Sequence, residues 1–366
     1  MPIRVALIGP GNCGSLALTQ LIEDPRFELT AVGVSSDEKV GKDAGELAGI
    51  SGILATTGII ATKGVDDALA TAPDCLVYTA DGDTRMPEAM ADVMRALAAG
   101  INVVGSAPGV LQYPWGVIPD KYIGRVEEAA RQGNSTIFIT GVDPGFGTDL
   151  LPLAIASTCQ RIEQVRTMEI ADYATYDGAT VMFDVMGFGN AIGDFPILFQ
   201  PGVLSIAWGT AIRQLAAGLG IEVDEIRDSV EQEPAPEDFD VAVGRIAKGT
   251  VAALRFQIEG MVKGQPAIVV EHVTRLRADL RPDWAQPAHP GGSYRVEITG
   301  EPSYFVDIVP TSKNGGAPYA AILAAAGRIV NAIPAVLEAP AGISTTLSLP
   351  FVTGAGTYRG AVATVN

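Results

Sequence analysis

The sequence predicts an α/β protein, with an N-terminal doubly wound parallel sheet followed by an α+β part. Three observations predict it. Short apolar runs alternate with helical patterns over residues 4–140, runs of strands follow residue 150, and the first apolar run ends in a glycine-rich turn. Alternating strands and helices are typical of parallel sheets. The 366 residues are enough for two domains.

The first expected strand, residues 4–8, runs directly into a Gly-x-Gly-x-x-Gly turn and a helical pattern over residues 16–22. This context predicts a Rossmann dinucleotide site, because Gly9 suits a tight turn, Gly11 lets backbone amides approach a pyrophosphate, and Gly14 allows close helix–strand packing. The helix N-terminus adds a partial positive charge. The cofactor-binding residues expected here are Gly9, Pro10, Gly11, Asn12, Cys13 and Gly14.

The second expected strand, residues 28–34, ends where a Rossmann fold contacts the adenosine ribose. The residues at that end include Ser35, Ser36 and Lys39, which suit the 2′-phosphate of NADP, whereas Asp37 suits the ribose of NAD. A solvated loop is the alternative interpretation. We predict NADP as the cofactor, with NAD possible.

The remaining elements of this part are helices over 43–48, 86–99 and 119–131 and strands over 58–62, 74–80, 101–105 and 135–140. Ligands bind beyond the carboxyl ends of parallel strands. The loops 79–85, 105–116 and 141–149 are therefore expected to face cofactor and substrate, with Thr79, Ala80 and Ser106 contacting the cofactor.

After residue 150 the pattern changes to strands over 162–171, 252–263, 266–276, 293–300 and 303–309, with a helix over 201–218 that has a polar break. The second and third strands meet at Lys263-Gly264-Gln265, a predicted hairpin. Residues 231–238 are expected to be an acidic surface loop. An Ala-rich helix over 318–338 lacks a polar face, which predicts burial.

These patterns predict a dinucleotide-binding domain over 1–150, an α+β substrate and dimerisation domain over 151–315, and a C-terminal helix and tail over 316–366 packing back on the first domain. Such an antiparallel or mixed sheet could both line a substrate pocket and pair two protomers.

Composition limits the possible partners. The chain is 48% hydrophobic and 18% charged, with a net charge of −17, which indicates a folded protein and argues against nucleic acid or an anionic membrane as partner. Its three cysteines are widely spaced and fit neither a disulfide framework nor a zinc site, so no metal is expected. Without a signal-peptide or membrane-spanning pattern, a cytoplasmic protein is predicted.

Asp143 is the first candidate catalytic residue, because it follows the strand over 135–140 at the expected mouth of the cofactor cleft. A carboxylate there could anchor an ammonium or iminium group, or serve as a general acid or base. Alternatively, Asp143 forms a turn with Pro144-Gly145. Asp149 is expected to cap the following helix.

Aromatic residues and one histidine complete the candidate site. Tyr113 and the apolar loop 106–116 suit a nicotinamide wall and a substrate, and His272 lies on an expected strand, where it could orient a substrate or simply pack. His289 is expected on a surface loop. Phe146, Met168 and Tyr173 are the predicted substrate-pocket residues. The hydrolase and kinase motifs Gly-x-Ser-x-Gly, His-Glu-x-x-His and Gly-Lys-Ser/Thr are absent from the sequence.

With these residues identified, the chain resembles, over nearly its whole length, the dihydrodipicolinate-reductase-like family that contains 2,4-diaminopentanoate dehydrogenase and the native amine dehydrogenases. The markers are the turn at 9–14, Glu38 to Leu47, Tyr113-Pro114, Asp143 to Phe146, Glu271 to Arg275, and Val330 to Val336. The resemblance implies a Rossmann domain, a substrate domain, a homodimer, and NAD(P)H-dependent reductive amination of a carbonyl with ammonia. In that reaction hydride attacks an imine while a carboxylate stabilises the cationic nitrogen.

The chain departs from the family at one point. The amine dehydrogenases look to keep a Glu shortly before the Tyr-Pro pair, and that place falls at about Pro108 or Gly109 here. At Asp143, where relatives look to carry Asn, this chain has gained a carboxylate. We therefore expect an amine dehydrogenase for small aliphatic ketones or aldehydes, with Asp143, Tyr113 and His272 as catalytic residues. The alternatives are a carbonyl or imine reductase that uses no free ammonia, and a non-catalytic NADP-binding protein.

Overall fold

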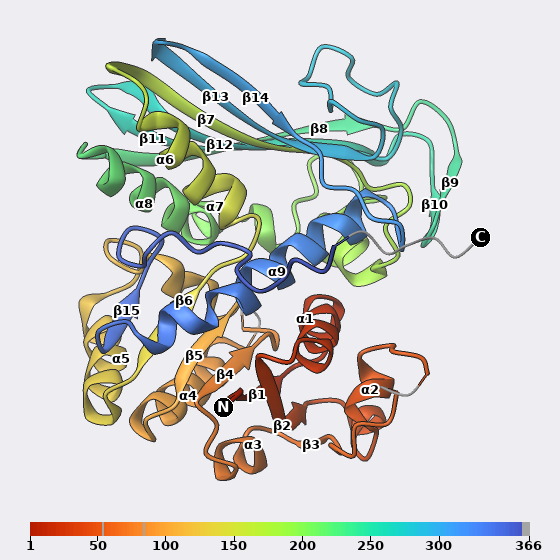
Figure 1. Ribbon diagram of the computed structural model, residues 1–366. Helices are drawn as coiled ribbons and strands as arrows, with labels where there is room; N and C mark the ends of the chain where they lie inside the picture. The colour runs from red at the N-terminus through yellow and green to blue at the C-terminus, as the bar shows by residue number, and fades with distance from the viewer. Residues whose placement is uncertain (53–54, 83–84, 361–366) are drawn as a thin grey trace. The chain divides into compact units, whose positions relative to one another are not determined.

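The computed structural model describes residues 1–52, 55–82 and 85–360, and the chain forms two compact units (Figure 1). Unit 1 comprises Met1–Gln112, Ile118–Gly141 and Ile322–Asn366, and unit 2 comprises Tyr113–Val117 and Val142–Ala321. Each unit has its own sheet and its own hydrophobic core.

Unit 1 contains a seven-stranded sheet in which every strand pair is parallel, in the order β15-β6-β5-β4-β1-β2-β3. Its strands are β1 (Ile3–Ile8), β2 (Phe27–Val34), β3 (Thr62–Lys63), β4 (Cys75–Tyr78), β5 (Asn102–Gly105), β6 (Thr136–Ile139) and β15 (Gly342–Ser344). The predicted doubly wound Rossmann sheet is confirmed. β15 was not predicted, because three residues near the C-terminus carry too little pattern to indicate a strand.

Helices cover both faces of this sheet, which explains why its strands are apolar on both sides. Val5 and Leu7 of β1 share a core with α1 (Asn12–Glu23) and α9 (Ala317–Leu337). Ala6 and Ile8 share the opposite core with three other helices. These are α3 (Asp66–Ala70), α4 (Met86–Ala98) and α5 (Asp120–Gly133). The short α2 (Ala44–Leu47) begins at Asp43, whose carboxylate accepts from the Gly45 amide.

Helix α9 is long and apolar enough to cross a membrane when judged by length and composition alone. Its side chains at Ile329, Val330 and Ile333 are fully buried in the core of unit 1. These contacts, like the lack of a polar face in the sequence, fit a core helix.

Unit 2 contains a six-stranded mixed sheet in the order β14-β13-β7-β12-β11-β8, in which only the β7–β12 pair is parallel among the described residues. Its strands are β7 (Arg161–Asp172), β8 (Glu225–Pro234), β11 (Val251–Val262), β12 (Gln265–Arg275), β13 (Gly292–Glu301) and β14 (Tyr304–Ile308). β9 (Phe239–Val241) and β10 (Gly244–Ile246) form a separate hairpin. The predicted hairpin between β11 and β12 is confirmed, with positive φ at Lys263 and Gly264.

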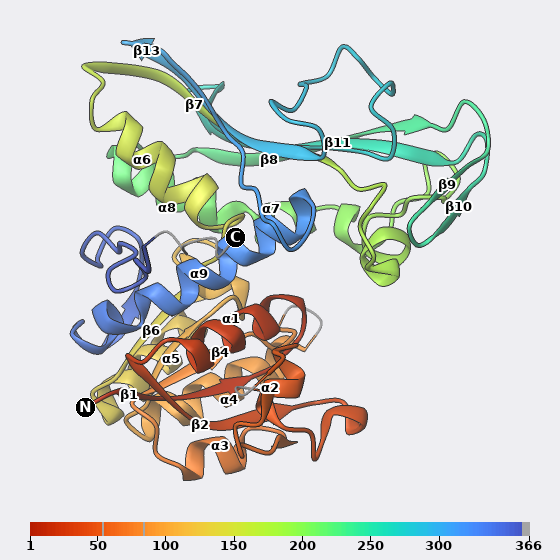
Figure 2. The ribbon, with the colours of Figure 1, turned by 45° about the vertical axis from the view of Figure 1, so that its right-hand side comes forward.

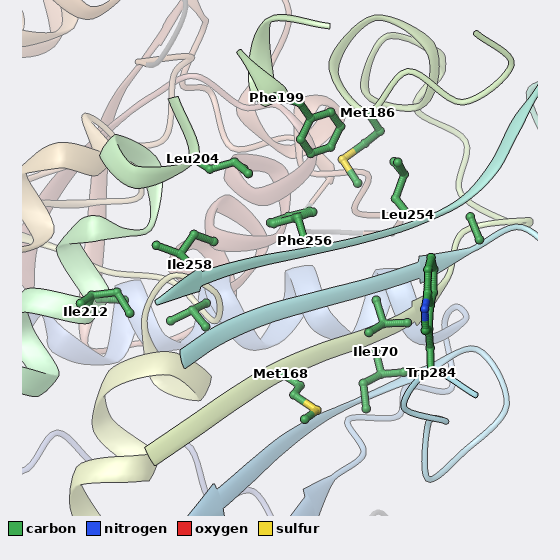
Figure 3. Packing of buried hydrophobic residues seen from close by; sticks show 14 of the residues in the cluster. Met168, Ile170, Met186, Phe199, Leu204, Ile212, Leu254, Phe256, Ile258 and Trp284 are labelled. Atoms are coloured by element: carbon green, nitrogen blue, oxygen red, sulfur yellow. The ribbon is translucent and has the colours of Figure 1, made fainter. Parts of the chain in front are cut away.

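Helices α6 (Leu151–Ala156), α7 (Val203–Ala207) and α8 (Gly209–Leu219) lie on one face of this sheet (Figure 2). Phe256 and Ile258 of β11 point toward Phe199 and Leu204 on the helical side (Figure 3). Short helical turns occupy Asp37–Lys39, Gly109–Gln112, Phe146–Leu150, Thr180–Val185 and Ile197–Phe199.

Three predicted elements differ from the structure. Residues 231–238 do not form only a loop, because Glu225–Pro234 is the edge strand β8, whose acidic side chains pair with Arg255 and Arg281 rather than marking a turn. The strand expected over 58–62 is reduced to β3 and an isolated bridge at Ile60. The helix expected over 201–218 is two helices that meet at Trp208.

Candidate active site

The glycine turn of unit 1 is closely packed at Gly9 and Gly14 and open at Gly11. Gly9 has a φ of +86°, and a Cβ there would lie 2.4 Å from the Ala80 Cα. A Cβ on Gly14 would lie 2.1 Å from the Gly9 carbonyl oxygen, whereas a Cβ on Gly11 would meet nothing within 4 Å. Gly9 and Gly14 therefore allow the turn to pack, and Gly11 leaves space beside the backbone amides.

The start of α1 suits an anion. Within the described residues, no side-chain hydrogen bond caps the helix at Gly11, and no acidic residue lies in its first turn. Lys39 Nζ donates to the Pro10 carbonyl at 2.7 Å, which places a cation next to the turn. Burial raises the pKa of the Cys13 thiol to about 11, so it adds no negative charge. The residues present therefore fit the pyrophosphate of a nicotinamide dinucleotide.

The residues expected around the rest of the cofactor are placed as follows. Thr79 Oγ1 donates to the Gly9 carbonyl at 3.0 Å, so it supports the turn from the end of β4. Ser106 is exposed after β5, and Ser35 is exposed after β2. Asp37 is ion-paired with Lys63, whose hydrogen bond lowers the pKa of that carboxyl. Residues 83 and 84 of the predicted loop 79–85 lie outside the described part of the chain.

In unit 2, Asp143 and His272 meet. Asp143 lies on the turn between Val142 and Gly145, as its sequence suggested, but its side chain is only 1% exposed. Its Oδ1 accepts from Trp208 Nε1 at 3.0 Å, and its Oδ2 lies 3.2 Å from His272 Nε2. The residue therefore forms the turn and also contacts the candidate histidine.

His272 is enclosed by aromatic rings. Phe256 stacks on its imidazole at 4.5 Å and 8°, and Trp208 meets it edge-on at 4.7 Å. Burial is the strongest influence and would lower the pKa of His272, but the acids around it, Asp143 foremost with Glu169 and Glu271, together outweigh burial, and the pKa is raised. The pair therefore favours an imidazolium next to a carboxylate.

Glu169 joins these two residues and was missed by the sequence analysis. In the sheet it is in register with His272 on β12 and Tyr294 on β13, so the three side chains share one face. Its Oε1 accepts from the Tyr173 hydroxyl at 3.0 Å. Burial raises the pKa of Glu169. The available signal was weak: an acid between the apolar residues Met168 and Ile170, in a strand that also carries Glu163 and Asp172.

Tyr173 supports Glu169 from the end of β7. The negative charge of Glu169, followed by burial, raises the pKa of Tyr173 well above its usual value, so the phenol stays a hydrogen-bond donor. Its ring stacks on Tyr176 at 5.2 Å. Of the predicted substrate-pocket residues, Tyr173 is the one that contacts this cluster directly.

Other candidates lie elsewhere in unit 2. Met168 is in register with Glu271 and Arg295, on the sheet face opposite Glu169, and packs in the core (Figure 3). The Tyr113 ring lies edge-on to Trp115 at 5.1 Å. Phe146 begins a helical turn, and His289 is exposed.

Asp149 does not cap α6, contrary to the prediction. It lies inside the helical turn Phe146–Leu150, fully buried, and its Oδ2 accepts from Gln214 Nε2 of α8 at 2.7 Å. The helical structure starts at Phe146, earlier than the sequence indicated, so Asp149 lies inside it and bonds to α8 instead of capping α6.

Asp143, Glu169 and His272 each offer one atom, and these atoms all lie within 4.8 Å of one another. Asp143 Oδ2 and His272 Nε2 are buried and form no well-aligned hydrogen bond within the described residues, although they face each other. Two carboxyls and one imidazole can hold a protonated nitrogen or a metal ion. We call these three residues the acid–histidine cluster.

Comparisons with known proteins agree with this fold. The family described as the 2,4-diaminopentanoate dehydrogenase C-terminal domain matches residues 146–361. An amine dehydrogenase from Streptomyces virginiae is 36% identical over 350 residues, which cover 95% of this chain and 96% of the relative. A 2,4-diaminopentanoate dehydrogenase from Acetoanaerobium sticklandii is 22% identical, with 95% and 93% of the two chains covered.

Among solved structures, an amine dehydrogenase from Mycobacterium smegmatis has a TM-score of 0.77 at 20% identity, with 98% of each chain covered. A probable dehydrogenase from Thermotoga maritima has a TM-score of 0.57 at 14% identity, with 94% and 92% of the two chains covered. Both structures support the two-part α/β fold. With the family match over more than half the chain, these findings show that the chain is an oxidoreductase belonging to the family of 2,4-diaminopentanoate dehydrogenase and the amine dehydrogenases.

Proposed function

We propose that this protein catalyses NADP-dependent reductive amination of small, mostly aliphatic ketones or aldehydes with ammonia. The observation that carries the proposal is the buried contact between Asp143 and His272, at 3.2 Å, in a chain 36% identical to an amine dehydrogenase. A carboxylate in an aromatic, largely dry environment stabilises a cationic nitrogen better than one in water.

Asp143 is proposed as the anchor of the cationic nitrogen and as an acid/base group. His272 and Tyr113 are proposed to orient the substrate, and Phe146 and Tyr173 to contact its carbon chain. The nicotinamide, when bound, supplies the hydride. Trp208 supports the role of Asp143, because its indole N–H fixes Oδ1 and leaves Oδ2 on the side of His272.

NADP is proposed over NAD because of the charges beside the glycine turn. Lys39 is held at the Pro10 carbonyl, and the hydroxyls of Ser35 and Ser36 lie at the end of β2. Asp37, the residue that would bind a ribose in an NAD enzyme, is already paired with Lys63.

The first experiment measures oxidation of NADPH and NADH by the purified protein with short ketones and aldehydes, each with and without ammonium at alkaline pH. Oxidation that requires ammonium supports amination. Oxidation that is equal without ammonium overturns it and indicates a carbonyl reductase. The absence of oxidation with any compound, while NADPH still binds, argues against turnover of this substrate class.

The cofactor choice predicts a specific effect of Lys39→Ala. Loss of a charged contact to the 2′-phosphate raises the KM for NADPH about tenfold and leaves the KM for NADH within about twofold. Lys42→Ala is the matched control, because Lys42 is a nearby exposed cation that pairs with Glu46. An equal rise in the KM for NADPH and the KM for NADH in Lys39→Ala would contradict a 2′-phosphate contact.

We further propose a soluble cytoplasmic homodimer that pairs through the sheet of unit 2. Sedimentation velocity of the full chain tests the oligomeric state, and a monomer at micromolar concentration would contradict it.

A further inference from the structure

Glu169 is the member of the acid–histidine cluster that has an oxygen left for a substrate. Asp143 Oδ1 accepts from Trp208, and Asp143 Oδ2 faces His272 Nε2 at 3.2 Å without a well-aligned hydrogen bond. Glu169 Oε1 accepts from Tyr173, while no described donor reaches Oε2. As whole residues, Asp143 and Glu169 are both partly exposed, whereas His272 is buried.

The charges of the cluster do not balance. The charged groups that act on Glu169 are His272 from β12 and Asp143 from the turn before Phe146, and the neutral phenols of Tyr173 and Tyr294 also face it. With both carboxyls ionised and the imidazole protonated, the cluster has a net charge of −1 in buried surroundings. A proton on Glu169 or a bound cation removes this cost.

Reductive amination needs a group of this kind. Ammonium must lose a proton before its nitrogen can attack a carbonyl, and the resulting carbinolamine must gain a proton on its hydroxyl before water can leave. Two carboxyls held in different environments can divide such work, one ionised as an anchor and one that carries the proton.

We propose that Glu169 is a catalytic residue that takes a proton from ammonium and returns it to the hydroxyl that leaves as water. This inference rests on the proposed reductive amination. The Glu169 carboxylate accepts the ammonium proton, and the freed ammonia adds to the carbonyl carbon while one of its protons passes to the oxygen. The carboxyl proton then moves to the hydroxyl of the carbinolamine, the C–O bond breaks with its electron pair leaving on water, and the nitrogen lone pair forms the C=N bond. The iminium remains beside Asp143, and Glu169 is again a carboxylate.

The test separates dehydration from hydride transfer. Wild type, Glu169→Gln and Asp143→Asn are assayed with NADPH, first on a short ketone plus ammonium and then on a preformed five-membered cyclic imine, which needs no dehydration. We expect Glu169→Gln to lose about 100-fold or more in kcat for amination and to keep cyclic-imine reduction within about threefold. Asp143→Asn should lose both, since the anchor serves both substrates.

The matched control is Glu163→Gln, an exposed acid on the same strand that pairs with Arg161. Amination by Glu169→Gln within threefold of wild type overturns the proposal, as does an equal loss on both substrates. Failure of wild type to require ammonium would instead overturn the proposed function, so the two failures differ. Circular dichroism and the melting temperature establish that each variant folds.

A second measurement covers the case in which wild type does not accept the cyclic imine. Because the Glu169 carboxylate must first accept the ammonium proton, kcat for amination rises as pH rises through the pKa of Glu169, Glu169→Gln lacks that limb, and Glu169→Asp restores it. An unchanged limb in Glu169→Gln overturns the proposal. So does one equivalent of a divalent metal in wild type that is lost in Glu169→Gln, because the cluster would then be a metal site.

Discussion

Two neighbouring residues of β12, Glu271 and His272, point to opposite faces of the six-stranded sheet and have opposite surroundings. Glu271 is 3% exposed and lies among cations: Arg255 Nε donates to Oε1 at 2.9 Å, Gln257 Nε2 donates to Oε2 at 3.0 Å, and Arg166 forms a further ion pair. Both carboxylate oxygens of Glu271 therefore have donors.

On the other face, Asp143 and Glu169 share a single imidazole. No arginine or lysine is among the groups that act on Glu169 or His272 within the described residues. A buried acid with guanidinium partners is compensated and serves the fold. Buried acids that outnumber their cations hold a proton or bind a cation, and such groups occur at reactive sites.

The largest expected effect comes from Asp143→Asn, which removes the anchoring charge with little change in shape. We expect kcat/KM for amination to fall by about 100-fold or more, with the melting temperature nearly unchanged. Steady-state kinetics and thermal denaturation test this together. Activity within a fewfold of wild type would show that Asp143 is not the acid/base group.

Glu271→Gln changes the acid that has arginine partners. We expect it to lower the free energy of unfolding and to leave kcat unchanged. It leaves Arg166 without the Glu271 carboxylate and Arg255 with only the Glu231 carboxylate, and breaking a buried ion pair costs about 3–5 kcal/mol. Because Arg166 and Arg255 keep 22% and 28% exposure, we expect a smaller loss in the free energy of unfolding, about 2 kcal/mol. Urea denaturation measures it, with Glu163→Gln as the surface control. A large fall in kcat with unchanged stability would contradict a purely structural role for Glu271.

The smallest expected effect is that of Tyr173→Phe. The phenol donates to Glu169 and favours its ionised form, so removing the donor raises the pKa of Glu169 further. The carboxylate that accepts the ammonium proton then forms only at higher pH, and the acid limb of kcat for amination moves to higher pH. The maximal kcat should change by about threefold at most. A limb that moves downward would mean that Tyr173 does not act through Glu169.

Much of unit 1 could be predicted from the sequence because its signals are local. The turn at Gly9, Gly11 and Gly14 needs only its own spacing and flanking apolar runs, and helices such as α4 and α5 carry complete amphipathic patterns. β8 could not be predicted in this way. It is a half-exposed edge strand whose acidic residues are explained only by Arg255 and Arg281, which lie far along the chain.

The candidate site likewise has a part that the sequence predicted and a part that it did not. Asp143 and His272 were each recognised from their local surroundings, but nothing in the sequence pairs residues so far apart. Glu169 was overlooked because it is one of several charged residues along its strand, and Met168 was chosen instead, although alternation places the two on opposite faces.

The sequence by itself therefore determined the fold class, the glycine turn and the family, since these depend on residue types at fixed short spacings. Only the tertiary structure decided which buried acids have cationic partners. Strand register brings Arg166 and Arg255 to Glu271 and places His272 beside Glu169, and the turn at Asp143 brings a second carboxyl to 3.2 Å from His272. The pKa of a buried carboxyl depends on the charges within a few ångströms, whatever their distance along the chain.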